Sequence, residues 1–132
     1  MPFLDTNKKV WVVKDLEIPV IENTPMKEMK WFRDKIKWAA EREEKNDITT
    51  TQALETDEEW WEKTAQVGLG LTVDEILDTG ITEPDFRELM AEVYSFLATL
   101  GTIERAKLSV LYDPEIQKKD PKLLKTTQNS KN

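Results

Sequence analysis

The sequence contains no cysteine and no histidine. Without cysteine the chain cannot form disulfides, and without either residue type it cannot build the usual thiolate or imidazole zinc sites. The same absences exclude catalytic systems that pair serine or cysteine with histidine, and they remove the common general base near neutral pH. We therefore expect a protein that is not an enzyme and that needs no cofactor or metal.

Long apolar runs are absent as well. The longest stretch without a charged residue is 93–103, which is 11 residues, whereas a membrane-spanning helix needs about 20 apolar residues. The first residues do not show the basic region and apolar run of a signal peptide. The sequence predicts a cytoplasmic protein with no membrane partner.

Acidic residues outnumber basic ones, and the net charge is −7. Residues 113–132 hold five lysines and three acidic residues, so the rest of the chain is more acidic than the net charge indicates. An acidic surface repels phosphate groups. We therefore expect no nucleic-acid partner and favour binding to other proteins.

The N-terminal third combines a short β pattern with a long helical one. After a loose lead at 1–9, the β-rich runs 10–13 and 16–21 predict a small hairpin, in which Pro19 keeps the second strand at an edge. Thr24 and Pro25 are a typical helix start and predict a helix over 25–45. Its expected core face consists of Met26, Met29, Phe32, Ile36, Ala39 and Ala40.

The centre of the chain shows short helices with clear boundaries. Residues 48–51 lead into a second helical region that contains Ala53 and Leu54. Thr56 with Glu59 forms a capping-box pattern, which predicts that a new helix begins at Thr56. We expect the glycines at 68 and 70 to end that helix, rather than to hold a phosphate. Thr72 with Glu75 is another capping box and predicts a short helix that closes near Gly80.

The clearest helix begins at residue 82 or 83 and ends at Gly101. Its apolar residues keep helical spacing on one face: Phe86, Leu89, Met90, Val93, Phe96, Leu97 and Leu100. One more short helix is predicted over 102–111, and residues 113–132 lack apolar spacing. The expected fold is mainly α: a helical domain at 1–112 with four to five helices and an N-terminal hairpin, followed by a disordered polar tail at 113–132.

Tryptophan is the most unusual part of the composition, with five residues. Trp31 and Trp38 lie seven residues apart, almost opposite the apolar face of their predicted helix. Either the hairpin or a later helix buries them, or they form an exposed strip that binds a protein, as interface hot spots favour Trp and Arg. Trp60 and Trp61 point about 100° apart, so one can close the core while the other contacts a partner. The candidate protein-binding residues are Trp31, Trp38, Lys27, Lys35, Arg42, Trp60 and Trp61.

The order of these elements resembles that of a known family. The segment 48–54 (ITTTQAL) is similar to the turn into the central helix of lambda-type tail assembly chaperones. The segment 71–78 (LTVDEILD), followed by 86–96, is similar to a part of their relatives in phages of Gram-positive hosts. Over residues 16–111 the sequence thus resembles the tail assembly chaperones of long-tailed bacteriophages.

The resemblance implies a function. Such chaperones coat the long tape measure protein in the cytoplasm of the infected cell, keep its apolar helices soluble, recruit tail tube subunits and leave before the virion is complete. The implied partners are the tape measure and tail tube proteins. The resemblance leaves open whether the protein forms a homo-oligomer. The family has no catalytic motif, so the resemblance assigns no site residue. The alternative is a small acidic regulator or inhibitor that mimics nucleic acid, although basic residues interleave the acidic ones through 27–45.

Removal of the polar tail should leave the folded domain intact. Because residues 113–132 show no apolar periodicity, truncation after Tyr112 should change the thermal midpoint by less than about 5 °C, which corresponds to about 1 kcal/mol for a domain of this size. Thermal unfolding of the full and shortened chains measures this, and a larger drop would show that the tail contributes to folding.

Overall fold

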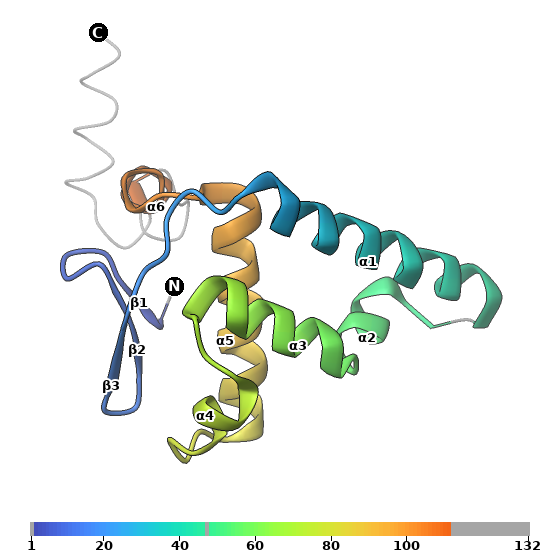
Figure 1. Cartoon of the computed structure of the whole chain (residues 1–132), viewed down its shortest axis with the longest axis horizontal. Helices are drawn as coiled ribbons and strands as arrows, with labels where there is room; N and C mark the ends of the chain where they lie inside the picture. Colours follow the sequence, from blue (N-terminus) through green and yellow to red (C-terminus); the bar gives the residue numbers. More distant parts are fainter. Residues whose placement is uncertain (1, 47, 112–132) are drawn as a thin grey trace, which may run out of the picture.

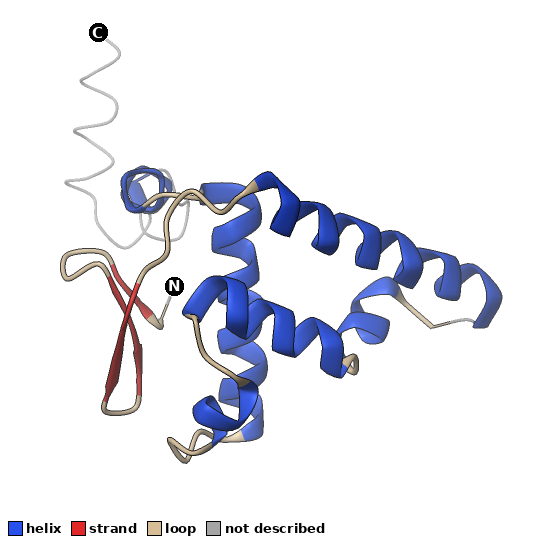
Figure 2. Cartoon of the chain, in the orientation of Figure 1, coloured by secondary structure: helices blue, strands red, loops and turns tan. Residues whose placement is uncertain are grey.

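The computed structural model describes residues 2–46 and 48–111, and this part of the chain is mostly helical with a small N-terminal sheet (Figures 1 and 2). This confirms the predicted fold class. The described residues form six α-helices, and the predicted tail at 113–132 lies outside them. The elements are β1 (Leu4–Asp5), β2 (Val10–Val13), β3 (Leu16–Pro19), α1 (Met26–Asn46), α2 (Thr50–Glu55), α3 (Glu58–Thr64), the π-helical η1 (Ala65–Leu69), α4 (Val73–Leu77), α5 (Glu83–Ser95), the π-helical η2 (Phe96–Leu100) and α6 (Ile103–Leu111).

The predicted hairpin is present as β2 and β3, but the sheet has a third strand. Its order is β1-β2-β3 with antiparallel pairing, so β3 and its Pro19 lie at an edge as expected. The loose lead expected at 1–9 was wrong in part, because Leu4 pairs with Trp11 in the sheet. A long-range contact accounts for this: both carboxylate oxygens of Glu92 on α5 accept a hydrogen bond from the backbone N–H of Phe3, at 3.2 Å. Burial raises the pKa of Glu92, although this hydrogen bond opposes the shift.

Helix α1 is the longest element and extends away from the sheet (Figure 1). Phe32 and Ala39 on the predicted core face are fully buried. Met26, the first residue of the helix, is 78% exposed, and Ala40 is exposed although its neighbour Ala39 is fully buried. The buried stripe of α1 is therefore both shorter and narrower than the face that the apolar spacing predicted.

Side-chain caps set the boundaries of the central helices. Asp57, and not Thr56 as predicted, begins α3, since its Oδ1 accepts a hydrogen bond from the backbone N–H of Trp60 at 3.0 Å. Thr56 instead ends α2. The capping box of Thr72 with Glu75 is present as predicted and begins α4.

The two glycines after α3 have different roles. Gly70 has a left-handed backbone (φ 69°) and ends η1, as expected of a terminating glycine. Gly68 does not end the helix: it lies inside η1, is buried, and faces Val93 of α5. A Cβ atom at Gly68 would overlap the Cγ1 of Val93. The residue therefore sets how closely η1 approaches α5.

The core forms around the continuous helix α5–η2, which runs through the middle of the molecule (Figure 1). On the sheet side, the ring of Trp11 meets that of Phe96 edge to face at 5.6 Å between centroids. Six residues of the apolar face predicted for this helix are each at most 7% exposed and belong to the core: Phe86, Leu89, Met90, Val93, Phe96 and Leu97.

Substitution of Gly68 tests the close approach of η1 and α5. We expect Gly68→Ala to destabilise the fold by about 1–3 kcal/mol through overpacking, because the Val93 side chain is buried and a β-branched residue in a helix has one preferred rotamer. The double variant with Val93→Ala should lose less stability than the two single variants together, by about 1 kcal/mol. Urea unfolding of the four proteins measures the coupling, and strictly additive losses would contradict the proposed overlap.

Candidate functional site

The structure divides the predicted tryptophan set into core and surface. Trp60 is 7% exposed and packs edge to face on Phe32, with ring centroids 5.1 Å apart. It also packs on Tyr94 in a tilted arrangement, with centroids 4.7 Å apart. It is part of the core, as the sequence predicted for one member of the Trp60 and Trp61 pair. Trp31 is half-buried and joins this aromatic cluster, with its centroid 5.4 Å from that of Phe32 and 6.3 Å from that of Trp60. Of the two tryptophans in the predicted strip, Trp31 therefore packs against the core.

Trp38 lies at the surface, which is one of the two positions that the sequence left open. It is 36% exposed, and two cations lie over its ring: the Nζ of Lys35 at 4.0 Å from the centroid and the Cζ of Arg42 at 4.9 Å. Both distances fall within the range of a cation–π interaction. The indole is thus held in place before any partner arrives, and its exposed part remains available.

Lys35 also ties α1 to the beginning of α3. Its Nζ lies 2.9 Å from the Oδ2 of Asp57 and 3.1 Å from the Oε2 of Glu59. Burial alone would lower the pKa of Lys35, but hydrogen bonds and charge attraction from these two carboxylates outweigh it and raise the pKa. Lys35 therefore stays protonated over Trp38 while it bridges two helices.

A second ion pair closes the other end of the α1–α3 contact. The Nζ of Lys63 lies 2.7 Å from the Oε2 of Glu28, and the same ammonium lies 5.7 Å from the centroid of the Trp31 ring. Lys27, the remaining predicted basic residue, is exposed one turn before Trp31. Of the three basic residues in the predicted set, two therefore contact Trp38, and Lys27 lies at the other end of the strip.

An open hollow lies between α1 and the first turn of α3. It has a volume of about 460 Å³ and is lined by Trp31, Asp34, Lys35, Trp38 and Glu59. It offers two tryptophan rings and charges of both signs, which suits a polar or aromatic side chain of a partner.

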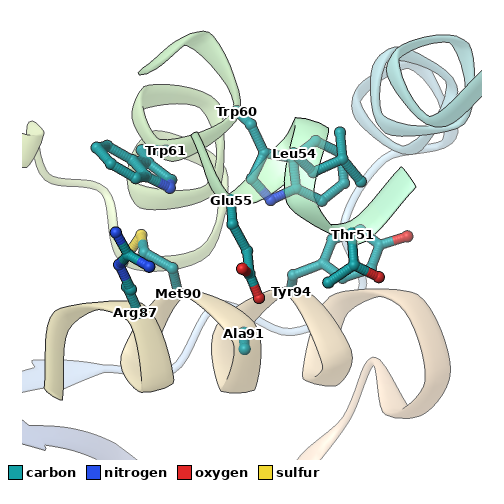
Figure 3. A pocket seen from close by; sticks show the side chains of 9 residues that line it. All are labelled: Thr51, Leu54, Glu55, Trp60, Trp61, Arg87, Met90, Ala91 and Tyr94. Carbon is teal, nitrogen blue, oxygen red and sulfur yellow. The ribbon is translucent and has the colours of Figure 1, made fainter. Parts of the chain in front are cut away.

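A second, more apolar hollow lies on the other side of Trp60, where α2 and α3 cross α5 (Figure 3). Trp61 forms one wall, and its ring meets Phe86 edge to face at 5.5 Å. The full lining is Thr51, Leu54, Glu55, Trp60, Trp61, Arg87, Met90, Ala91 and Tyr94. Sequence reasoning identified the two tryptophans and missed the rest, because Tyr94 and Ala91 lie beside the main apolar face of α5 and carry no signal of their own.

Comparisons with protein-family models, curated proteins and solved structures give no match for this chain. Within residues 2–46 and 48–111, no helix is long and apolar enough to cross a membrane. The described part of the chain also holds no group of three acidic side chains placed to bind a metal ion.

The two tryptophans of the strip should respond differently to truncation. Trp31→Ala removes aromatic contacts with Phe32 and Trp60 and should cost about 2 kcal/mol or more of unfolding free energy. Trp38→Ala removes exposed cation–π contacts and should cost about 1 kcal/mol or less. Chemical unfolding of both variants measures the difference. Equal losses would mean that Trp31 and Trp38 share one environment.

Proposed function

We propose that this protein is a non-enzymatic tail assembly chaperone of a long-tailed bacteriophage, which binds the tape measure protein in the host cytoplasm and recruits tail tube subunits. The observation that carries the proposal is the exposed indole of Trp38, which Lys35 and Arg42 contact and which lines an open hollow. The resemblance over residues 16–111 supplies the identity of the partners.

The chemistry of this surface favours a protein ligand. A tryptophan at the centre of an interface contributes much of its binding energy, and a ring already fixed in position loses little conformational freedom on binding. The hollow beside it offers Asp34 and Glu59 as acceptors and Lys35 as a donor. Such a site can hold both an apolar and a polar side chain of a partner.

The charge of the chain is compatible with a chaperone role. A net charge of −7 keeps the protein soluble and separates its copies at the high concentration that coating a long client requires. The helical surfaces of such a chaperone can then cover apolar helices of the client.

Co-expression tests the proposal directly. The protein is produced together with candidate tape measure and tail tube proteins, and the complex is recovered by affinity purification. Trp38→Ala should weaken binding about thirtyfold, which corresponds to about 2 kcal/mol, while the fold stays intact. Leu108→Ala is the matched control, because Leu108 is also an exposed large apolar residue, on α6.

Two results would reject the proposal: no complex with either tail protein, or equal binding by wild type and Trp38→Ala. An acidic inhibitor is the second candidate, favoured by the net charge of −7. It predicts binding to basic nucleic-acid enzymes that salt weakens strongly. Titration of a purified nuclease with and without 0.5 M salt (about a 4 Å screening length) distinguishes the two.

A further inference from the structure

We infer that the apolar hollow between α2, α3 and α5 is a second protein-binding site, which takes one apolar side chain of a basic amphipathic helix. This site is separate from the Trp38 surface, so the inference goes beyond the proposed function and does not depend on its partners. Four properties of the hollow carry it: its size, its lining, its charge and the helical origin of every wall.

Size and lining set the class of ligand. The cavity has a volume of about 200 Å³, below the range of about 300–1,000 Å³ that is usual for small-molecule sites, and it is large enough for a single leucine or phenylalanine side chain. Met90 and Trp60 are buried and form its floor, while Leu54, Trp61 and Tyr94 are half-buried walls. An apolar side chain that enters the hollow therefore meets apolar groups on most sides.

The rim places polar groups around this apolar floor. Glu55, Arg87 and Ala91 line the hollow and are exposed, and Figure 3 shows Glu55 reaching across it from α2 toward α5. Because Ala91 has a short side chain, it leaves the mouth open on the α5 side. The rim can therefore contact the polar flank of a ligand whose apolar anchor fills the hollow.

Charge selects the sign of that flank. The charged side chains that line the hollow are Glu55 of α2 and Arg87 of α5. Arg87 already has a carboxylate partner, since its Nη2 lies 2.8 Å from the Oε1 of Glu83, whereas Glu55 forms no ion pair within the described residues. The uncompensated carboxylate of Glu55 at the rim favours lysine or arginine beside the anchor.

Backbone chemistry selects a helix over an extended peptide. All the residues that line the hollow lie on α2, α3 or α5, whose backbone groups are largely engaged within the helices. An extended peptide would find no strand edge there with which to pair. A helix satisfies its own backbone and presents apolar anchors at i, i+3 or i+4, and i+7. The ligand that fits is thus a helix with one apolar face and basic flanks.

A designed peptide tests the site. The probe is a fluorescein-labelled peptide of about 15 residues, with leucines at helical spacing and lysines elsewhere. Its matched control carries glutamates in place of the lysines. Fluorescence anisotropy measures the affinity of each peptide for the full chain. The lysine peptide should bind at least about tenfold more tightly than the glutamate peptide, and added salt should reduce this difference.

Variants of the protein locate the contact. Ala91→Trp fills the mouth of the hollow and should weaken binding of the lysine peptide about tenfold or more. Ala98→Trp makes the same change at another exposed alanine of the same continuous helix, outside the hollow, and should change binding less than about twofold. Glu55→Lys, an exposed charge reversal at the rim, should weaken binding without loss of the thermal midpoint. If Ala91→Trp fails to fold, the Glu55→Lys variant still tests whether the peptide binds at the hollow.

Three results would overturn the inference: no measurable binding of the lysine peptide to the wild type, equal affinity for both peptides, or equal weakening by Ala98→Trp and by the variants at the hollow. The Trp38→Ala variant separates this site from the proposed function, since it should leave peptide affinity unchanged. A protein that binds the peptide at the hollow but no tail protein would retain this site and lose the chaperone role.

Discussion

The fold depends on covering the apolar helix α5–η2 from several directions at once. The chain has no cysteine to cross-link its elements, so burial of this helix must provide much of the stability. The sheet packs Trp11 against Phe96, and η1 brings Gly68 against Val93. From α1, Phe32 reaches Tyr94, with ring centroids 5.4 Å apart. A short sheet that would be unstable alone persists because it is one of these covers.

Local signals in the sequence predicted most elements of the fold, and contacts between distant residues account for the failures. The helical spacing of α5 and the capping box at Thr72 depend on neighbours a few residues away, so they can be seen in the sequence. Strand β1 could not be seen in the sequence, because its position depends on a hydrogen bond from the backbone N–H of Phe3 to Glu92, 89 residues away. The one-residue error at Asp57 has a similar origin, since that cap also binds Lys35 of α1.

The candidate site, too, could be predicted only where it depends on neighbours within one helix. Helical geometry alone placed Lys35 and Arg42 beside Trp38, and the structure brings all three together. Geometry within one helix could not show that α3 would carry Trp60 under Trp31 and make one half of the strip part of the core. An aromatic residue opposite the main apolar face becomes core or surface according to which helix packs there.

The aromatic cluster joins the two hollows and constrains how each can be studied. Trp60 lines the apolar hollow, and its neighbour Trp31 lines the hollow beside Trp38. A substitution at Trp60 would therefore disturb both hollows and the core together, and a lost interaction could not be assigned to any of them. Residues at the rims carry no such ambiguity, because Trp38 and Ala91 are exposed and lie on different helices. Lys35 does carry this ambiguity: its side chain is only 14% exposed, it pairs with the cap of α3 and it lies over Trp38. A substitution there would disturb the Trp38 surface and the contact between α1 and α3 together.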